Sequence, residues 1–366
     1  MKILFFIESL RSGGKERRLV ELIKGLAANP SLEMEIVLTK KDIHYKDIFS
    51  TNIKVHYTVR KFLKKDPQIF FKFYSIAKKF RPDVIHVWGN LVAIYALPAK
   101  VILRIPLVNN QITDAPLNVS NSILSHKLTF PYSDKIIANC YAGLKAYDAP
   151  ENKSSVIYNG FDFDRISNLY NKDIIREKFS ITTKYIIGMV ASFSEKKDFE
   201  TYVRSANLVL SKGFDVTFLC IGAGDDSKCK QIVDQNNVNR ILFLGKQSNV
   251  ESIMNICDIG VLITNNEKHG EGISNALLEF SALNKPLIAT LGGGNGELIQ
   301  EGHSGFLIGQ KAPDELAEKI AFFLEDDKRR VDFGNKGRER IENEFTIEKM
   351  INAFTNAYSA IIKEKK

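Results

Sequence analysis

Cysteine is scarce in this chain of 366 residues, and long hydrophobic runs are missing from it. Its four cysteines show no CxxC spacing, which argues against a disulfide framework or a thiolate zinc site and favours free thiols in a reducing compartment. The apolar run of residues 3–7 stops at Glu8, too short for a signal peptide, and no run approaches the length that spans a bilayer. We therefore expect a cytoplasmic protein, with at most peripheral contact to the inner face of the cytoplasmic membrane.

The dinucleotide fingerprint GxGxxG is also missing from both halves of the chain, which argues against a nicotinamide dehydrogenase. No nucleic-acid-binding module has its signature in the sequence, so no nucleic acid partner is expected. The net charge of +8 and the pI near 9.0 nevertheless predict anionic partners. Nucleotide phosphates and acidic lipids are the candidates that remain.

Short apolar runs alternate with amphipathic stretches along almost the whole sequence. Glycine or charge at each strand exit, in repeated strand–helix units, predicts parallel sheets with right-handed crossovers. This alternation of strand and helix patterns stops after the Asn159-Gly160 turn and then resumes. The interruption predicts two Rossmann-like, doubly wound α/β domains facing across a cleft. We place them at residues 1–165 and 166–345, with a helix over 346–366 that returns to the first. The expected strands cover residues 2–7, 34–38, 53–59, 82–89, 106–112, 135–139, 156–158, 185–193, 216–221, 241–244, 259–264 and 286–290. Residues 302–308 are expected to form a turn and a short final strand.

The stretch from His269 to Glu279 is the centre of the functional prediction. It follows an apolar run, residues 259–264, and is expected to open a helix at a strand-to-helix crevice, where α/β sheets bind ligands. Free amides at the helix start would seat a phosphate, and two carboxylates, Glu271 and Glu279, would lie on one helix face. This arrangement suits a sugar nucleotide. The alternative is that Glu271 only caps the helix and Glu279 is a solvated helix residue.

Other strand exits carry weaker signals. Gly13 and Gly14 form a turn that either brings backbone amides to a ligand or is a plain tight turn. His86 lies near the carboxyl end of a strand and could face the cleft, although a lone histidine there is more often structural. Asp162 and Asp164 form a DxD sequence, which can hold a divalent metal, but it lies in a turn between domains and no metal site is expected there.

Residues 60–81 mix basic and aromatic side chains. Positive charge beside rings would suit an anionic membrane surface or a lipid-diphosphate acceptor. The alternative is an ordinary surface helix with a core stripe.

Several of these motifs occur together and in order, and in this the sequence resembles the retaining GT-B glycosyltransferases of glycosyltransferase family 4. The resemblance spans nearly the whole chain and is strongest over residues 156–305. The motifs are Gly13-Gly14-Lys15-Glu16-Arg17, Asp83-Val84-Ile85-His86, Asn159-Gly160-Phe161-Asp162, Lys197-Asp198, Gly222-Ala223-Gly224-Asp225, Phe243-Leu244-Gly245, the E-x7-E pair of Glu271 and Glu279, and Gly293-Gly294 with Glu297.

The resemblance implies roles for individual residues. Glu271 would contact hydroxyls of the donor sugar and Glu279 the ribose, Lys197 would be the main cation on the diphosphate, and His86 would lie at the sugar or acceptor side of the cleft. Donor-binding positions would be Gly13, Gly14, Ser192, Gly224, Gly245, Lys246, Gly272, Ile273 and Ser274. Ser192 stands where the family often has arginine, and Trp88 stands at the later position of the His-x-His found in many members.

The function implied is transfer of a sugar from a nucleotide diphosphate to a saccharide or polyprenyl-diphosphate-linked acceptor, with retention and without a metal or other cofactor. A UDP-sugar is favoured over a GDP-sugar, and bacterial surface polysaccharide or glycan synthesis is the expected setting. Lys197 and the helix-start amides would stabilise the departing phosphate. Two alternatives stay open: a GT-B sugar-nucleotide epimerase, and a non-catalytic two-domain protein that binds a sugar or an anion.

Overall fold

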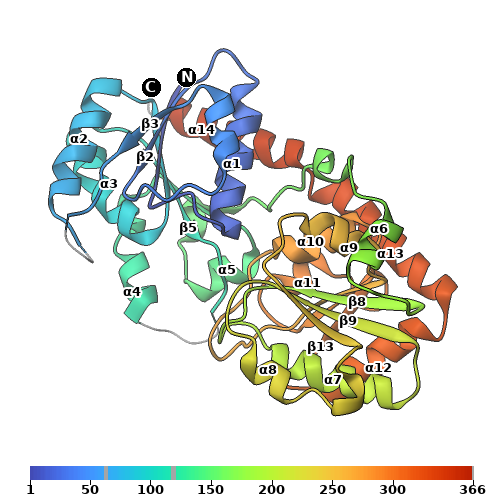
Figure 1. Cartoon of the computed structure of the whole chain (residues 1–366). Helices are drawn as coiled ribbons and strands as arrows, with labels where there is room; N and C mark the ends of the chain where they lie inside the picture. Colours follow the sequence, from blue (N-terminus) through green and yellow to red (C-terminus); the bar gives the residue numbers. More distant parts are fainter. Residues whose placement is uncertain (62–64, 117–120, 365–366) are drawn as a thin grey trace. The chain divides into compact units, whose positions relative to one another are not determined.

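The computed structural model describes residues 1–61, 65–116 and 121–364. The chain forms two compact units (Figure 1): unit 1 is Met1–Gly160 with Ile347–Lys366, and unit 2 is Phe161–Thr346. The chain thus leaves unit 1 at Gly160, five residues before the boundary drawn from the sequence at 165, and returns to it with the last helix.

Unit 1 is built on a seven-stranded parallel sheet in the order β3-β2-β1-β4-β5-β6-β7. The central strands β1, β4 and β5 are buried along almost their whole length because helices cover both faces of the sheet. The strands are β1 Lys2–Ile7, β2 Glu33–Leu38, β3 Lys54–Tyr57, β4 Val84–Trp88, β5 Leu107–Ile112, β6 Lys135–Ala138 and β7 Ser154–Val156.

Two separate hydrophobic clusters lie on the two faces of this sheet. One contains side chains of α1 and α14 with alternate residues of β1, β4 and β5, and the other contains side chains of α2 and α3 with the intervening residues. The α-helices of unit 1 in the described ranges are α1 Gly14–Ala27, α2 Gln68–Phe80, α3 Asn90–Ile102, α4 Asn121–Lys127, α5 Tyr141–Ala146 and α14 Ile347–Glu364.

Unit 2 repeats the design with a six-stranded parallel sheet in the order β10-β9-β8-β11-β12-β13. Its strands are β8 Tyr185–Val190, β9 Val216–Ile221, β10 Ile241–Gly245, β11 Ile259–Leu262, β12 Leu287–Thr290 and β13 Gly305–Ile308. Its α-helices are α6 Lys172–Lys178, α7 Phe199–Ser211, α8 Ser227–Gln231, α9 Val250–Ile256, α10 Asn275–Ala282, α11 Asn295–Leu298, α12 Pro313–Leu324 and α13 Asp327–Glu344.

Each sheet has a point where the strand order reverses: between β1 and β4 in unit 1, and between β8 and β11 in unit 2. Crossovers leave such a point in opposite directions, so the loops at the carboxyl ends of the two strands diverge and leave room for a ligand. Over the residues that the structure describes, none of the helices has the length and apolar character to cross a membrane.

Candidate functional site

The loops that leave β8 and β11, at the reversal point of unit 2, are joined by backbone pairing. Lys197 forms an antiparallel bridge with Thr264, and the amide of Asp198 donates to the carbonyl of Ile263 at 3.0 Å. Asp198 also begins α7, since its carboxylate accepts from the amide of Thr201 at 2.9 Å and so caps the helix. Lys197 is therefore held between a strand exit and a capped helix.

Lys197 and Glu271 form an ion pair across these two loops. The same carboxylate oxygen of Glu271 lies 3.4 Å from Nε2 of His269. Burial alone would raise the pKa of Glu271, but the charge of Lys197 and the contact with His269 outweigh it and bring that pKa to about 2. Glu271 is thus ionised at neutral pH and accepts hydrogen bonds without donating one.

A run of three glycines after β12 packs directly on the backbone of Glu271. Gly293 has φ +58°, and a Cβ there would lie 2.1 Å from the carbonyl oxygen of Glu271. The amide of Gly294 donates to that same oxygen at 2.9 Å. These glycines were part of a motif in the sequence but were not singled out as site residues. The signal was a glycine run at a strand exit, which often marks a close backbone approach.

The expected helix start is wrong by several residues. Helix α10 begins at Asn275 with Ser274 as its extended N-cap, so Gly272, Ile273 and Ser274 lie in a buried loop before the helix. The glycine loop after β12 crowds the backbone of Gly272, and this packing holds the segment non-helical. The orphan amides at the start of α10 therefore belong to Asn275 and the residues that follow it. Glu271, being outside the helix, does not share a helix face with Glu279.

Glu279 is almost fully buried, with 4% of its surface exposed, and is not a solvated helix residue. One of its oxygens accepts from Arg165 Nη2 at 2.7 Å, and the same nitrogen pairs with Glu251 of α9. Arg165 lies in a short 3-10 helix, Phe163–Ile166, and was missed in the sequence because no local pattern distinguishes it. It orients Glu279 from a distant part of unit 2.

The DxD sequence, Asp162 and Asp164, lies at the start of this same 3-10 helix. The carboxylate of Asp162 accepts from the amide of Asp164 at 3.0 Å and caps the 3-10 helix. Among the residues that the structure describes, no group of three or more histidine, cysteine or acidic side chains could hold a metal ion.

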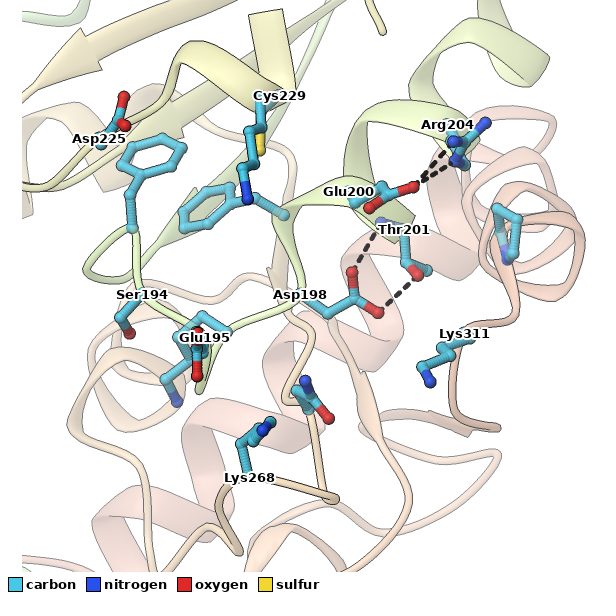
Figure 2. A pocket seen from close by; sticks show the side chains of 16 residues that line it. Ser194, Glu195, Asp198, Glu200, Thr201, Arg204, Asp225, Cys229, Lys268 and Lys311 are labelled. Carbon is cyan, nitrogen blue, oxygen red and sulfur yellow. Dashed lines mark hydrogen bonds and ion pairs between the residues drawn. The ribbon is translucent and has the colours of Figure 1, made fainter.

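A cavity of about 700 Å³ borders Lys197 at the start of α7 (Figure 2). Its lining is strongly charged. The basic side chains are Lys197, Arg204, Lys228, Lys268 and Lys311, and the acidic ones are Glu195, Asp198, Glu200 and Asp225. Arg204 pairs with Glu200 at 2.8 Å, so part of the charge is already compensated. A polar, charged cavity at strand carboxyl ends suits a phosphorylated ligand.

The other predicted residues of unit 2 lie on the exits of neighbouring strands. Ser192 is exposed after β8, and its hydroxyl is 3.3 Å from that of Ser194. Gly224 has φ +128°, and a Cβ there would lie 2.3 Å from the carbonyl oxygen of Phe193, so this position requires glycine. Gly245 ends β10 with φ +61° and is followed by exposed Lys246. The structure thus gathers the loops after β8, β9 and β10 on one edge of the sheet.

In unit 1, Gly13 and Gly14 stand at the beginning of α1. Gly13 is the extended N-cap and Gly14 the first helical residue. The hydroxyl of Tyr45 donates to the carbonyl oxygen of Gly13 at 3.2 Å. The loop is therefore at the carboxyl end of β1, beside the reversal point of the first sheet.

His86 differs from the expectation that it faces a cleft. Its side chain is fully buried, with Nδ1 2.7 Å from the hydroxyl of Tyr358, and its ring lies between Phe5 and Phe354. Burial, and secondly the charge of Arg18, keep the pKa of His86 well below its usual range. Helix α14, which covers this face of the sheet, is what removes His86 from solvent.

Comparisons with known proteins agree with this architecture. The family model described as Glycosyltransferase Family 4 matches residues 12–165, and the model described as Glycosyl transferases group 1 matches residues 171–340. The chain is 28% identical over 228 residues to the capsular polysaccharide biosynthesis glycosyltransferase CapM of Staphylococcus aureus, a match that covers 59% of this chain and 58% of that protein.

A longer match, 25% identical over 361 residues, covers 93% of this chain and 94% of a relative from Campylobacter jejuni. That relative is the N-acetylgalactosamine-N,N'-diacetylbacillosaminyl-diphospho-undecaprenol 4-alpha-N-acetylgalactosaminyltransferase. The fold is similar to that of Anabaena Alr3699/HepE, crystallised with UDP and glucose, with a TM-score of 0.83 at 20% identity over 98% of this chain and 99% of that one. The chain therefore belongs to the GT-B glycosyltransferases of family 4, as its sequence motifs predicted.

Proposed function

We propose that this glycosyltransferase transfers a sugar from a UDP-sugar to a saccharide or polyprenyl-diphosphate-linked acceptor, with retention of the anomeric configuration. The observation that carries the proposal is the Lys197–Glu271 pair at the reversal point of unit 2. It sets a cation for a diphosphate next to an ionised carboxylate for sugar hydroxyls. UDP is favoured because the similar HepE fold was crystallised with UDP and glucose.

The acceptor class and the biological setting are supported by the relatives. The Campylobacter relative is named for an undecaprenyl-diphosphate-linked acceptor, and CapM for capsular polysaccharide synthesis. We therefore propose a role in the synthesis of a bacterial surface polysaccharide or glycan.

In the proposed reaction, the diphosphate draws the ammonium group of Lys197 from Glu271. Negative charge grows on the departing phosphate as the bond to the sugar breaks, and Lys197 opposes that charge. Glu271, kept ionised by its environment, accepts from donor-sugar hydroxyls and orients the ring. The departing diphosphate takes the proton of the acceptor on the same face of the sugar, so the new bond forms on the side from which the old one left.

The donor is tested by thermal-shift screening with UDP, GDP, ADP and their common sugars, with and without divalent metal. Ligands that bind only the folded state raise the melting temperature, so selective stabilisation by UDP and UDP-sugars without metal is expected. Stabilisation by GDP alone would refute the base assignment. The anomeric configuration of the product, read by proton NMR, tests retention, and release of an epimerised free sugar nucleotide would instead indicate an epimerase.

Lys197→Met tests the assigned chemistry. Removal of one charge-stabilising donor is expected to lower kcat by about 10²–10³-fold, with a smaller effect on KM. The matched control is Lys196→Met, because Lys196 is the exposed neighbour on the same loop. Equal activity of the two variants would remove Lys197 from the mechanism.

We further propose that α2 contacts an anionic membrane, the surface that a lipid-linked acceptor would require. The helix has the core stripe expected of an ordinary surface helix, but Phe71 projects outward with 76% of its surface exposed, and Lys78 and Lys79 are exposed on the same helix. Rings and cations of this kind bind anionic interfaces. Phe62, Leu63 and Lys64, which belong to the predicted basic segment, lie outside the described residues.

Flotation with vesicles rich in anionic lipid tests this contact. Phe71→Ser together with Lys78→Glu is expected to reduce the bound fraction, whereas Tyr170→Ser, which removes an exposed ring from unit 2, should not. Unchanged flotation of the α2 variant would refute the contact.

A further inference from the structure

His269 is a third partner in the Lys197–Glu271 ion pair. The turn that carries it follows β11, and the amide of His269 donates to the carbonyl oxygen of Asn265 at 2.9 Å. The amide of Asn265 in turn donates to the carbonyl oxygen of Lys196 at 3.0 Å. The histidine turn is therefore fixed to the loop that carries Lys197, and both side chains are held against the same carboxylate.

The three side chains are mostly buried. Those of Lys197, Glu271 and His269 are 14%, 10% and 18% exposed. Nε2 of His269 lies 3.4 Å from the Glu271 oxygen that also pairs with Lys197. A neutral histidine can donate one hydrogen bond to a carboxylate, and only a protonated histidine adds a positive charge. In the free protein Lys197 already supplies that charge, so the ion pair is complete without a proton on the imidazole.

Binding of the donor changes this charge balance. In the proposed reaction the diphosphate draws the ammonium group of Lys197 from Glu271. Glu271 is 8% exposed, and a buried carboxylate without a cation is strongly disfavoured. The site therefore gains negative charge at the moment when its carboxylate loses its counter-charge, and both changes favour a proton on the imidazole beside it.

The charged groups around His269 are compatible with this change. On its own turn, Glu267 and Lys268 are exposed, and Glu267 pairs with Lys311 of the loop after β13 at 2.8 Å. The facing elements, the loop after β8 and the segment before α10, contribute the ion pair described above. Glu271 is thus the carboxylate that the structure places against the imidazole.

We propose that His269 is a positioning residue that takes up a proton from solvent when the nucleotide sugar binds. As a cation it holds Glu271 ionised and directed at the donor-sugar hydroxyls, and it returns the proton to solvent when the nucleotide leaves. This role rests on the proposed function, because its starting point is the displacement of Lys197 by the diphosphate.

Isothermal titration calorimetry with UDP-glucose tests the proton uptake. UDP-glucose is the probe because it lacks the terminal phosphate of UDP, a group that titrates at about pH 6. Titrations at about pH 7.5, within the range where histidine changes charge, in buffers of different ionisation enthalpy give the number of protons bound. Wild type should take up protons, and its Kd for UDP-glucose should rise with pH, by up to about tenfold per pH unit.

His269→Gln separates the charge from the hydrogen bond. Glutamine keeps an N–H donor for Glu271 but cannot be protonated, so this variant should bind UDP-glucose without proton uptake and with a Kd that is constant over the same pH range. The matched control is His303→Gln, because His303 is an exposed histidine of the same unit. It should behave as wild type.

NMR of the imidazole rings gives a readout in wild type that needs no folded variant. The chain has six histidines, and one carbon-13-labelled ring should move to the chemical shift of the protonated form when UDP-glucose is added. Equal proton uptake by wild type and His269→Gln, or ring signals that do not move, would overturn this role and leave the donor assignment standing. The absence of any heat or thermal shift with nucleotide sugars would refute the proposed function, and this role with it.

Discussion

Lys197→Met should destabilise unit 2 because it leaves the Glu271 carboxylate buried without its main partner. The two side chains are only 14% and 10% exposed. The pKa of Glu271 falls from 4.5 to about 2, which at about 1.4 kcal/mol per pKa unit corresponds to about 3 kcal/mol in favour of the ionised form. Removing one partner of a buried pair costs about 3–5 kcal/mol. We therefore expect Lys197→Met to lower the free energy of unfolding by about 3 kcal/mol.

A double-mutant cycle measures the interaction energy between Lys197 and Glu271 apart from their contacts with other residues. When Glu271→Gln is combined with Lys197→Met, no buried charge is left unpaired at this position, so the combined loss should be smaller than the sum of the single losses by about 3 kcal/mol. Urea unfolding followed by far-UV circular dichroism gives the free energies. Trp88 fluorescence, recorded on the same samples, reports unit 1 separately. A coupling energy below about 0.5 kcal/mol would refute the reasoning, because the two losses would then be additive.

The lowered pKa of Glu271 also predicts that the stability of the folded chain depends on pH. The pKa of Glu271 is lower in the folded chain than its usual value of 4.5, so its stabilising contribution is fully present above about pH 4.5 and is lost as the pH falls through about 2. Glu271→Gln has no such group. The stability difference between wild type and this variant should therefore shrink between pH 5 and pH 3, and a constant difference would contradict the assigned pKa.

Further substitutions test the packing around the two reversal points. Gly293→Ala should cost about 3 kcal/mol or more, because φ is +58° and the new Cβ would lie 2.1 Å from the carbonyl oxygen of Glu271. Gly213→Ala, with φ +83° and open space around it, should cost only about 1 kcal/mol; equal losses in urea unfolding would contradict this account. Tyr358→Phe should cost about 1–3 kcal/mol because it leaves buried Nδ1 of His86 without its partner, and an unchanged urea midpoint by Trp88 fluorescence would argue that the bond contributes nothing.

The sequence by itself determined the two-sheet α/β plan and the family. Strands and crossover helices are local patterns: short apolar runs, amphipathic stretches and glycine at strand exits are all legible within a few residues. Glu271 could be selected in the same way, because a motif of fixed spacing follows a recognisable strand. Lys197 could be selected from the order of the motifs along the chain. In the structure it forms an ion pair with Glu271.

Only the tertiary structure decided how these residues are held. Arg165 meets Glu279 across 114 positions of sequence, and Tyr358 meets His86 across 272, and no local pattern encodes such pairings. His86 became a core residue because α14 returns to unit 1 and covers it. The helix expected at Glu271 begins at Asn275 instead because Gly293 and Gly294, from the next strand exit, pack on the preceding backbone. Contacts of this range depend on how whole elements fold together, and that is the information that periodicity and spacing lack.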